Sequence, residues 1–94
     1  MNLNLSEANR IILFGILKRY RGDFQFFAFG SRVKGTHKKY SDLDLAVKHN
    51  VGSDLTQLKN ELEESELSIT VDIVDLNTIS HDFKKLIEDD CVEL

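Results

Sequence analysis

Apolar residues near the start of the chain recur with the spacing of a helix. They stand at positions 8, 11, 12 and 16, and leucines at 13 and 17 with a tyrosine at 20 widen the stripe. Ser6 is a suitable N-cap before this run, and Gly22 is a suitable residue to end it. The pattern predicts a helix over residues 6–21, with an apolar face broad enough to contact a partner as well as the core.

Three later segments have the pattern of strands. The sequence FQFFAF (24–29) is short, aromatic and bounded by turn residues. Residues 41–48 (SDLDLAVK) alternate between leucine or valine on one face and aspartate or alanine on the other. Residues 67–76 alternate in the same way, with four aliphatic side chains on one face. We expect these strands to form one small sheet.

Helices are expected between and after the strands. A short helix is expected after Gly30, over about residues 31–35. Gly52 and Ser53 mark a turn and a cap for the next helix, whose apolar stripe is formed by Val51, Leu55, Leu58 and Leu62. A last helix is expected from about Ser80, with apolar residues at 83, 86 and 87. The order α-β-α-β-α-β-α predicts an α/β fold, a small mixed sheet flanked by helices, built as one domain over residues 1–94.

Composition and charge exclude several classes of function. The longest apolar run has seven residues, too few to span a bilayer, and we expect no membrane association. Residues 1–48 hold nine Lys or Arg against four Asp or Glu, whereas residues 49–94 hold three against twelve. With a net charge of −4, the chain is not expected to bind nucleic acid in general. Cys91 is the only cysteine, which fits the reducing cytoplasm.

Asp42 and Asp44 are the first candidates for chemistry. They are two residues apart on a predicted strand, so both carboxylates should project to the same side. Two like charges held that close are costly unless a cation lies between them, and hard oxygen donors suit Mg²⁺ or Mn²⁺. Taken alone, the pair is equally compatible with solvated aspartates at the end of a strand.

Asp72 gives that pair a third partner. It is a carboxylate inside a Val/Ile-rich strand, where an unpaired charge is expensive. If this strand neighbours the one with Asp42 and Asp44, the three carboxylates converge. Asp75 competes for the role, but alternation places it on the opposite face, with the apolar set or in the following turn. We therefore favour Asp72.

Gly30 and Ser31 follow a predicted strand and open a predicted helix. Glycine lets the backbone approach a ligand closely, and a serine hydroxyl with the amides of a helix start can bind phosphate oxygens. The stretch GSRVKGTH nearly fits the P-loop pattern, but Thr36 and His37 follow its second glycine, so the phosphate-binding lysine is absent. A plain turn also accounts for an isolated Gly-Ser pair.

The combination of these motifs is more specific than its parts. The stretch FGSRVKGTHKKYSDLDLAV, followed by VDIVDL, resembles the DNA polymerase beta-like nucleotidyltransferase superfamily. Within it, the chain is similar over essentially its whole length to the minimal nucleotidyltransferases, the MNT antitoxins that accompany HEPN-domain toxins. The resemblance implies the polymerase beta palm-like fold without the added substrate domain of larger relatives. The Arg-Pro common in the loop of relatives is replaced here by HKKY.

The resemblance also implies roles for particular residues. Gly30 and Ser31 match the pair that holds the nucleotide phosphates, and Arg32 stands where many relatives have an arginine that could touch phosphate. Lys34, Lys38 and Lys39 have no transferable role, although they would offset the negative charge of a triphosphate.

The aspartates receive the metal-binding and catalytic roles by the same resemblance. Asp42 and Asp44 match the pair that binds two divalent ions, Mg²⁺ or Mn²⁺, and Asp72 matches the third carboxylate, which helps activate the incoming hydroxyl. The implied reaction transfers a nucleoside monophosphate from ATP or another nucleoside triphosphate to a hydroxyl. In relatives of this kind the acceptor can be a tyrosine of the HEPN toxin.

Other functions stay open at this stage. The chain could neutralise its partner by binding alone, since its acidic second half suits a basic protein. Transfer to a small molecule or to a nucleic-acid end is a further alternative, as is an α/β domain with aspartates placed by chance. The sequence indicates neither the base, nor the acceptor, nor the number of nucleotides added. A homo- or hetero-oligomer would stabilise so small a domain.

Overall fold

A computed structural model describes residues 3–50 and 52–94 of the chain. The helices are α1 (Glu7–Leu17), a 3₁₀ turn η1 (Lys18–Tyr20), α2 (Ser31–Lys34), α3 (Thr56–Glu64) and α4 (His81–Asp89). The strands are β1 (Phe24–Phe29), β2 (Leu43–His49), β3 (Val71–Asp75) and β4 (Val92–Glu93). Within the described residues, none of these helices has the length and apolar character needed to cross a membrane.

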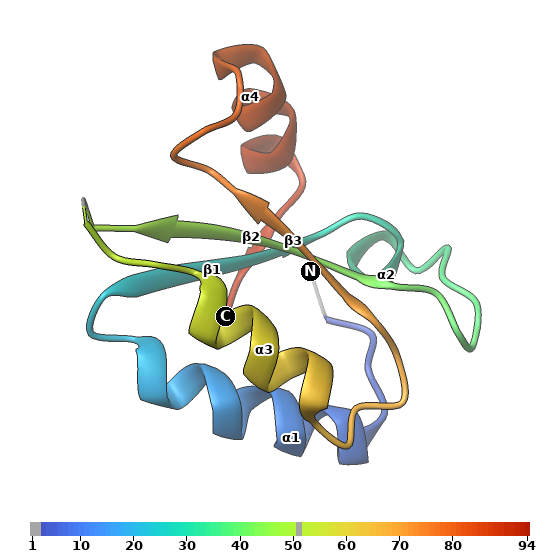
Figure 1. Cartoon of the computed structure of the whole chain (residues 1–94). Coiled ribbons are helices and arrows are strands. Elements are labelled where there is room, and N and C mark those ends of the chain that lie inside the picture. The colour runs from blue at the N-terminus through green and yellow to red at the C-terminus, as the bar shows by residue number, and fades with distance from the viewer. Residues whose placement is uncertain (1–2, 51) are drawn as a thin grey trace.

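The strands form one mixed sheet in the order β3-β2-β1-β4. β1 is antiparallel to both β2 and β4, whereas β2 and β3 are parallel. The parallel pair needs a crossover connection, which α3 supplies on one face of the sheet (Figure 1). The predicted α/β fold with a small mixed sheet is therefore confirmed.

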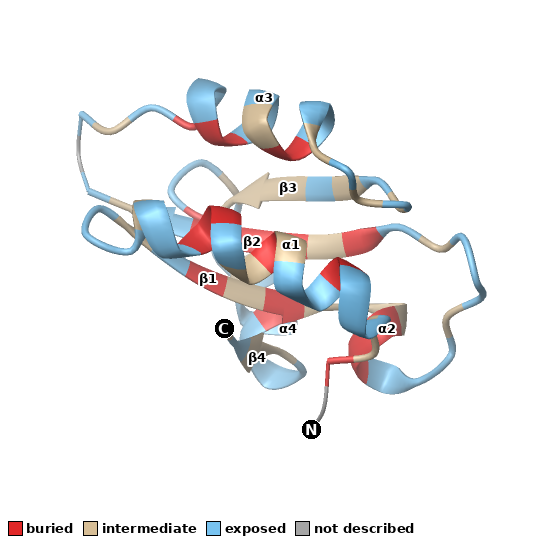
Figure 2. Ribbon diagram, turned by 90° about the horizontal axis from the view of Figure 1, so that it is seen from below, coloured by how far each residue is buried: buried red, intermediate tan, exposed pale blue. Residues whose placement is uncertain are grey.

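The main core lies between the sheet and the two helices α1 and α3, which cover the same face (Figures 1 and 2). Strand alternation supplies its sheet side, because every second residue of β1 and β2 points inward. The buried members of this core include Leu13 and Leu17 of α1, Phe26 of β1, Leu45 of β2 and Leu58 of α3. Burial of these side chains is the main stabilising term of the domain.

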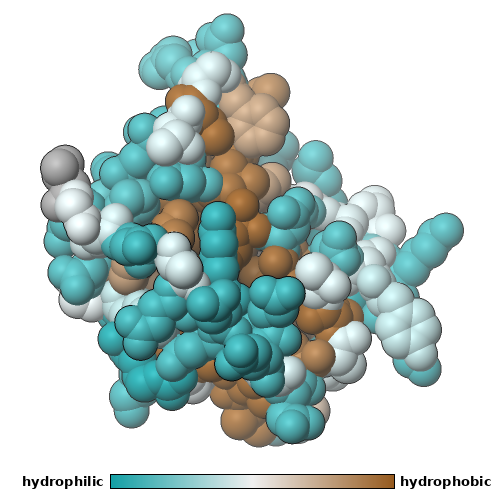
Figure 3. Space-filling view, in the orientation of Figure 1, coloured by the Kyte–Doolittle hydropathy of each residue, from teal (hydrophilic) through white to brown (hydrophobic). Residues whose placement is uncertain are grey.

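Among the described residues, α4 is the helix that packs on the second face of the sheet (Figure 1). A small cluster there contains Ala46 of β2, Leu76 and Ile87, and Ile87 is the only buried residue of α4. Phe83 and Leu86 of α4 are 45% and 70% exposed, although the sequence pattern grouped them with Ile87. Apolar side chains reach the surface around this helix in Figure 3. We call this face the open face, because Asp72 is exposed on it, although Ala46 is buried under α4.

Several element boundaries differ from those expected. The Ser6 side chain caps α1 as predicted, and α4 begins at the expected place, where the Ser80 side chain caps it. The strand predicted over 67–76 is shorter, and β4 was not predicted, because two residues carry too little periodicity. In α1 the buried face holds Asn9 while Ile11 is 67% exposed, because Asn9 pairs with Ser68 across the loop before β3. The prediction made for Val51 lies outside the described residues.

Candidate active site

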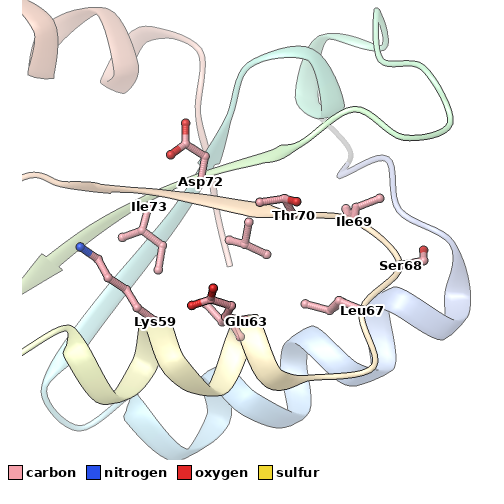
Figure 4. Close-up of a pocket in the computed structure, with 10 residues that line it drawn as sticks. Lys59, Glu63, Leu67, Ser68, Ile69, Thr70, Asp72 and Ile73 are labelled. Atoms are coloured by element: carbon pink, nitrogen blue, oxygen red, sulfur yellow. The ribbon is translucent and has the colours of Figure 1, made fainter.

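Asp44 and Asp72 lie side by side on the open face of the sheet. The parallel register pairs Asp44 of β2 directly with Asp72 of β3. Residues aligned in a parallel ladder project to the same face, and the Asp72 carboxylate points away from α3, opposite Ile73 (Figure 4). Asp72 is exposed and Asp44 is half-buried. Two sequence-predicted residues some thirty positions apart are thus brought together by strand pairing.

Asp42 completes the acidic group, but it precedes β2 instead of belonging to it. It is exposed, and the Leu43 amide that follows it donates to the Thr70 carbonyl at 2.9 Å. Burial raises the pKa of the Asp44 carboxyl above its ordinary value, and the negative charges of Asp72 and Asp42 raise it further. No basic side chain is among the causes of this shift. Asp44 is therefore held partly buried next to two other carboxylates.

Gly30 is fitted against this acidic group. It stands between β1 and α2 with φ +79°, a conformation that side chains rarely adopt. A Cβ atom at this position would lie about 2.3 Å from Oδ2 of Asp44, far inside van der Waals contact. The close approach of the Gly30 backbone and the Asp44 carboxylate therefore requires glycine. It also places Ser31, the first residue of α2, beside the carboxylates.

Arg32 has a different environment from the one predicted. It is 5% exposed, and its three guanidinium nitrogens donate to the backbone carbonyls of Asn4, Lys38, Lys39 and Ser41. Contact with a phosphate stays a prediction for this residue. The contacts that it makes are with Asn4, before α1, and with the loop between α2 and β2.

The donor set fits a divalent ion bound together with a substrate. Among the described residues, no group of three or more His, Cys, Asp or Glu side chains is already arranged as a metal cage. Mg²⁺ does not need such a cage, because it usually takes one or two carboxylates and completes its shell with water and substrate phosphates. Uncompensated carboxylates on an open face, with a raised pKa at Asp44, are suited to that arrangement.

Comparison with known proteins assigns the family. The family model described as "Polymerase beta, Nucleotidyltransferase" matches residues 13–92. A protein of Haemophilus influenzae named "Probable protein adenylyltransferase MntA" is 41% identical over 88 residues, which is 90% of this chain and 77% of that protein. The chain belongs to the polymerase beta nucleotidyltransferase family.

Solved structures agree with this assignment. A toxin-antitoxin structure with AMP-PNP matches with a TM-score of 0.70 and 25% identity, covering 95% of this chain and 72% of that one. A mutant of a toxin-antitoxin complex named MntA-HpeT matches with a TM-score of 0.68 and 26% identity, over 96% and 72%. A structure described as a minimal nucleotidyltransferase, 24% identical with a TM-score of 0.75 over 100% and 97%, supports the fold. The resemblance drawn from the sequence motifs is thus confirmed, and the chain is a nucleotidyltransferase.

Asp75 of the nucleotidyltransferase lies on the other face of β3, as alternation predicts. Its two carboxylate oxygens lie 3.0 and 3.1 Å from Nε2 of His49, at the end of β2. The hydrogen bond with Asp75 raises the pKa of His49 above its ordinary value, although partial burial opposes the rise. The His49 side chain is only 12% exposed. A sequence pattern gives no signal for this pair, because it depends on the register of β2 and β3.

A groove of about 580 Å³ lies between α3 and β3 of the nucleotidyltransferase (Figure 4). Lys59 and Glu63 of α3 line it together with aliphatic side chains of β3 and of the loop before it. Asp72 contributes to its wall, but the Asp72 carboxylate points to the opposite side of the strand. The groove is therefore separate from the acidic group of Asp42, Asp44 and Asp72.

Proposed function

We propose that the protein is a Mg²⁺-dependent protein adenylyltransferase and that it acts as an antitoxin. In this proposal it transfers AMP from ATP to a tyrosine hydroxyl of a HEPN-domain toxin, in the cytoplasm. The observation that carries the proposal is the alignment of Asp44 with Asp72 beside Gly30, on the open face of a nucleotidyltransferase sheet. The similarity to a probable protein adenylyltransferase of Haemophilus influenzae and to toxin-antitoxin structures supports a protein acceptor and an antitoxin role.

The carboxylates would hold the metal. We assign Asp42, Asp44 and Asp72 as ligands of Mg²⁺, with two ions per site and Mn²⁺ as a substitute. When bound, these ions neutralise charge on the attacking and leaving oxygens of the reaction. Asp72 is also assigned to the incoming hydroxyl, because it is exposed on the edge strand β3, where an acceptor can approach it from solvent.

Gly30 and Ser31 are assigned to the nucleotide. The backbone at Gly30 can approach a phosphate closely because no side chain intervenes, and the Ser31 hydroxyl is a donor at the start of α2. In the reaction the acceptor oxygen forms a bond with the α-phosphorus of ATP. The bond from that phosphorus to the oxygen bridging to the β-phosphate breaks, pyrophosphate leaves, and the hydroxyl proton passes to the carboxylate of Asp72.

The experiment measures transfer of α-³²P-labelled ATP to a purified HEPN-domain toxin in the presence of Mg²⁺. We expect Asp44→Asn to lower the rate at least about a hundredfold, because charge stabilisation in the transition state is lost. Asp75→Asn is the matched control, since it removes a carboxylate from the same strand pair but from the opposite face, and should leave transfer near the wild-type rate. Undiminished transfer by Asp44→Asn would refute the metal assignment.

A non-catalytic mode of inhibition is tested with the same proteins. Phe83 and Leu86 of α4 are exposed apolar side chains, which suit contact with a protein. If the toxin is silenced equally well without ATP and Mg²⁺, inhibition comes from binding alone. If silencing requires both and survives dilution of the complex, inhibition comes from covalent modification.

A further inference from the structure

We infer that Arg32 is a positioning residue, which fixes the loop of residues 36–41 and through it the backbone on which Asp42 stands. The inference rests on the proposed function for the role of Asp42. It differs from contact with a phosphate, because it assigns every guanidinium nitrogen of Arg32 to the protein itself.

The contacts of Arg32 join three segments that are distant in the sequence. Its Nη1 donates to the Asn4 carbonyl at 2.9 Å, and its own carbonyl accepts from the Asn4 amide and side chain, each at 2.7 Å. Its Nη2 donates to the carbonyls of Lys38 and Lys39 at 3.3 and 3.0 Å, and Nε donates to the Ser41 carbonyl at 3.0 Å. The segment before α1, helix α2 and the loop are therefore tied to one side chain.

We call Arg32 and its four carbonyl partners the clamp, and its last partner, Ser41, directly precedes Asp42. The Ser41 carbonyl, held by Arg32, belongs to the peptide unit that joins Ser41 to Asp42. On the other side of Asp42, the Leu43 amide is fixed to the Thr70 carbonyl at 2.9 Å. Asp42 is exposed and stands outside β2, so these two contacts are what set its position. An error of about 1 Å in such a group can lower a rate a hundredfold.

The geometry requires a guanidinium group. A planar fork with five N–H donors can satisfy four carbonyls in different directions, whereas a lysine ammonium is a single point with three donors. Arg32 has no carboxylate partner among the ion pairs formed by residues 3–50 and 52–94. The buried cation is thus compensated by backbone carbonyls, and removing it takes away the donor that holds all four of them.

Limited proteolysis tests the clamp without any need for activity. Trypsin cleaves after Lys38 and Lys39, whose carbonyls Arg32 holds, and after Lys84 on α4, which serves as the internal reference. In Arg32→Gln we expect cleavage at Lys38 and Lys39, followed by mass spectrometry, to be at least about tenfold faster than in the wild type because the loop opens locally. Arg32→Lys should show a smaller increase. Arg19→Gln, which removes an exposed arginine paired with Glu61, is the matched control and should show none.

The kinetics of transfer separate positioning from phosphate contact. Positioning predicts that Arg32→Lys lowers kcat about a hundredfold with little change in the KM for ATP. A steep rise in that KM with no change in cleavage at Lys38 would overturn the inference and favour a phosphate ligand. Equal acceleration at Lys84 in both Arg32 variants would also overturn it, since Arg32 would then support the whole fold. If Lys38 is protected from trypsin in the wild type but no AMP is transferred, the proposed function is refuted while the structural role of Arg32 still holds.

Discussion

The carboxylates at the two ends of the parallel pair β2–β3 have opposite environments. At one end Asp44 and Asp72 are aligned on the open face, with Asp42 beside them and no basic partner. At the other end Asp75 faces α3 and is paired with His49, while the Asn77 amide donates to an Asp75 carboxylate oxygen at 2.9 Å. One strand of five residues therefore carries an uncompensated and a compensated aspartate, three positions apart.

The difference shows which end costs stability and which end supplies it. Burying a carboxylate next to like charges opposes folding, and burial first, then the charges of Asp72 and Asp42, raise the pKa of Asp44. An aspartate bonded to a histidine and to a backbone amide contributes to stability instead. Function is thus expected where the fold leaves charge unbalanced, and the paired end serves as an internal reference for every measurement on the unpaired one.

The largest effect is expected from closing the space next to Asp44. Gly30→Ala places a Cβ about 2.3 Å from the Asp44 carboxylate and strains a backbone with φ +79°. We expect a loss of about 1–3 kcal/mol in the free energy of unfolding and transfer reduced at least about a hundredfold. Gly15→Ala is the control, because nothing lies near its Cβ position in α1, and it should stabilise the protein by about 0.5–1 kcal/mol. Normal transfer by Gly30→Ala would contradict the site geometry.

A smaller effect is expected from adding ions. Mg²⁺ should raise the melting temperature of the wild type and of Asp75→Asn, by roughly 4–8 °C for each 1 kcal/mol of binding energy, but not that of Asp44→Asn. Without Mg²⁺, Asp44→Asn should be more stable than the wild type at pH 7. Because the folded-state pKa of Asp44 is raised, this advantage should vanish below the ordinary pKa of aspartate. Equal ion effects in both variants would place the ion elsewhere.

The smallest effect concerns the paired end. The raised pKa of His49 means that its contribution to stability is fully present below the ordinary histidine pKa and is lost as the pH rises through the folded-state value. The difference in free energy of unfolding between the wild type and His49→Asn should be about 1 kcal/mol at most, larger at acid than at alkaline pH. Urea titrations across this range measure it, with His81→Asn at the exposed start of α4 as the control. A stability difference that grows with pH would contradict a raised pKa of His49 in the folded protein.

Much of the fold follows from the sequence because local signals and periodicity agree. The serine caps at positions 6 and 80 and the alternation around Asp44 and Asp72 are local properties of the chain. Alternation also explains why Asp75 is kept apart from Asp72. The family was recognisable because its glycine-serine pair and its aspartates occur in the right order on the right elements.

The remainder depends on contacts between distant segments. Strand order decides whether Asp44 and Asp72 are neighbours, and the strand order cannot be deduced from the alternation within each strand. The role of Arg32 depends on Asn4 and on the path of the loop, so a motif that places arginine next to Gly-Ser indicates the residue but not its partners. The start of α3 at Thr56 depends on the Asp54 carboxylate, which accepts from the Thr56 amide at 2.9 Å.

The place of β3 at the edge of the sheet has a consequence for handling the protein. Within the part of the chain that the structure describes, its outer backbone pairs with no other strand, and exposed edges of this kind promote aggregation unless charges guard them. In the sequence VDIVD those charges are Asp72 and Asp75, one on each face. Replacing Asp72 with an apolar residue or with asparagine would remove this guarding charge from the edge together with a proposed metal ligand. An inactive version that must stay soluble at high concentration is therefore better made as Asp44→Asn, on the inner strand β2.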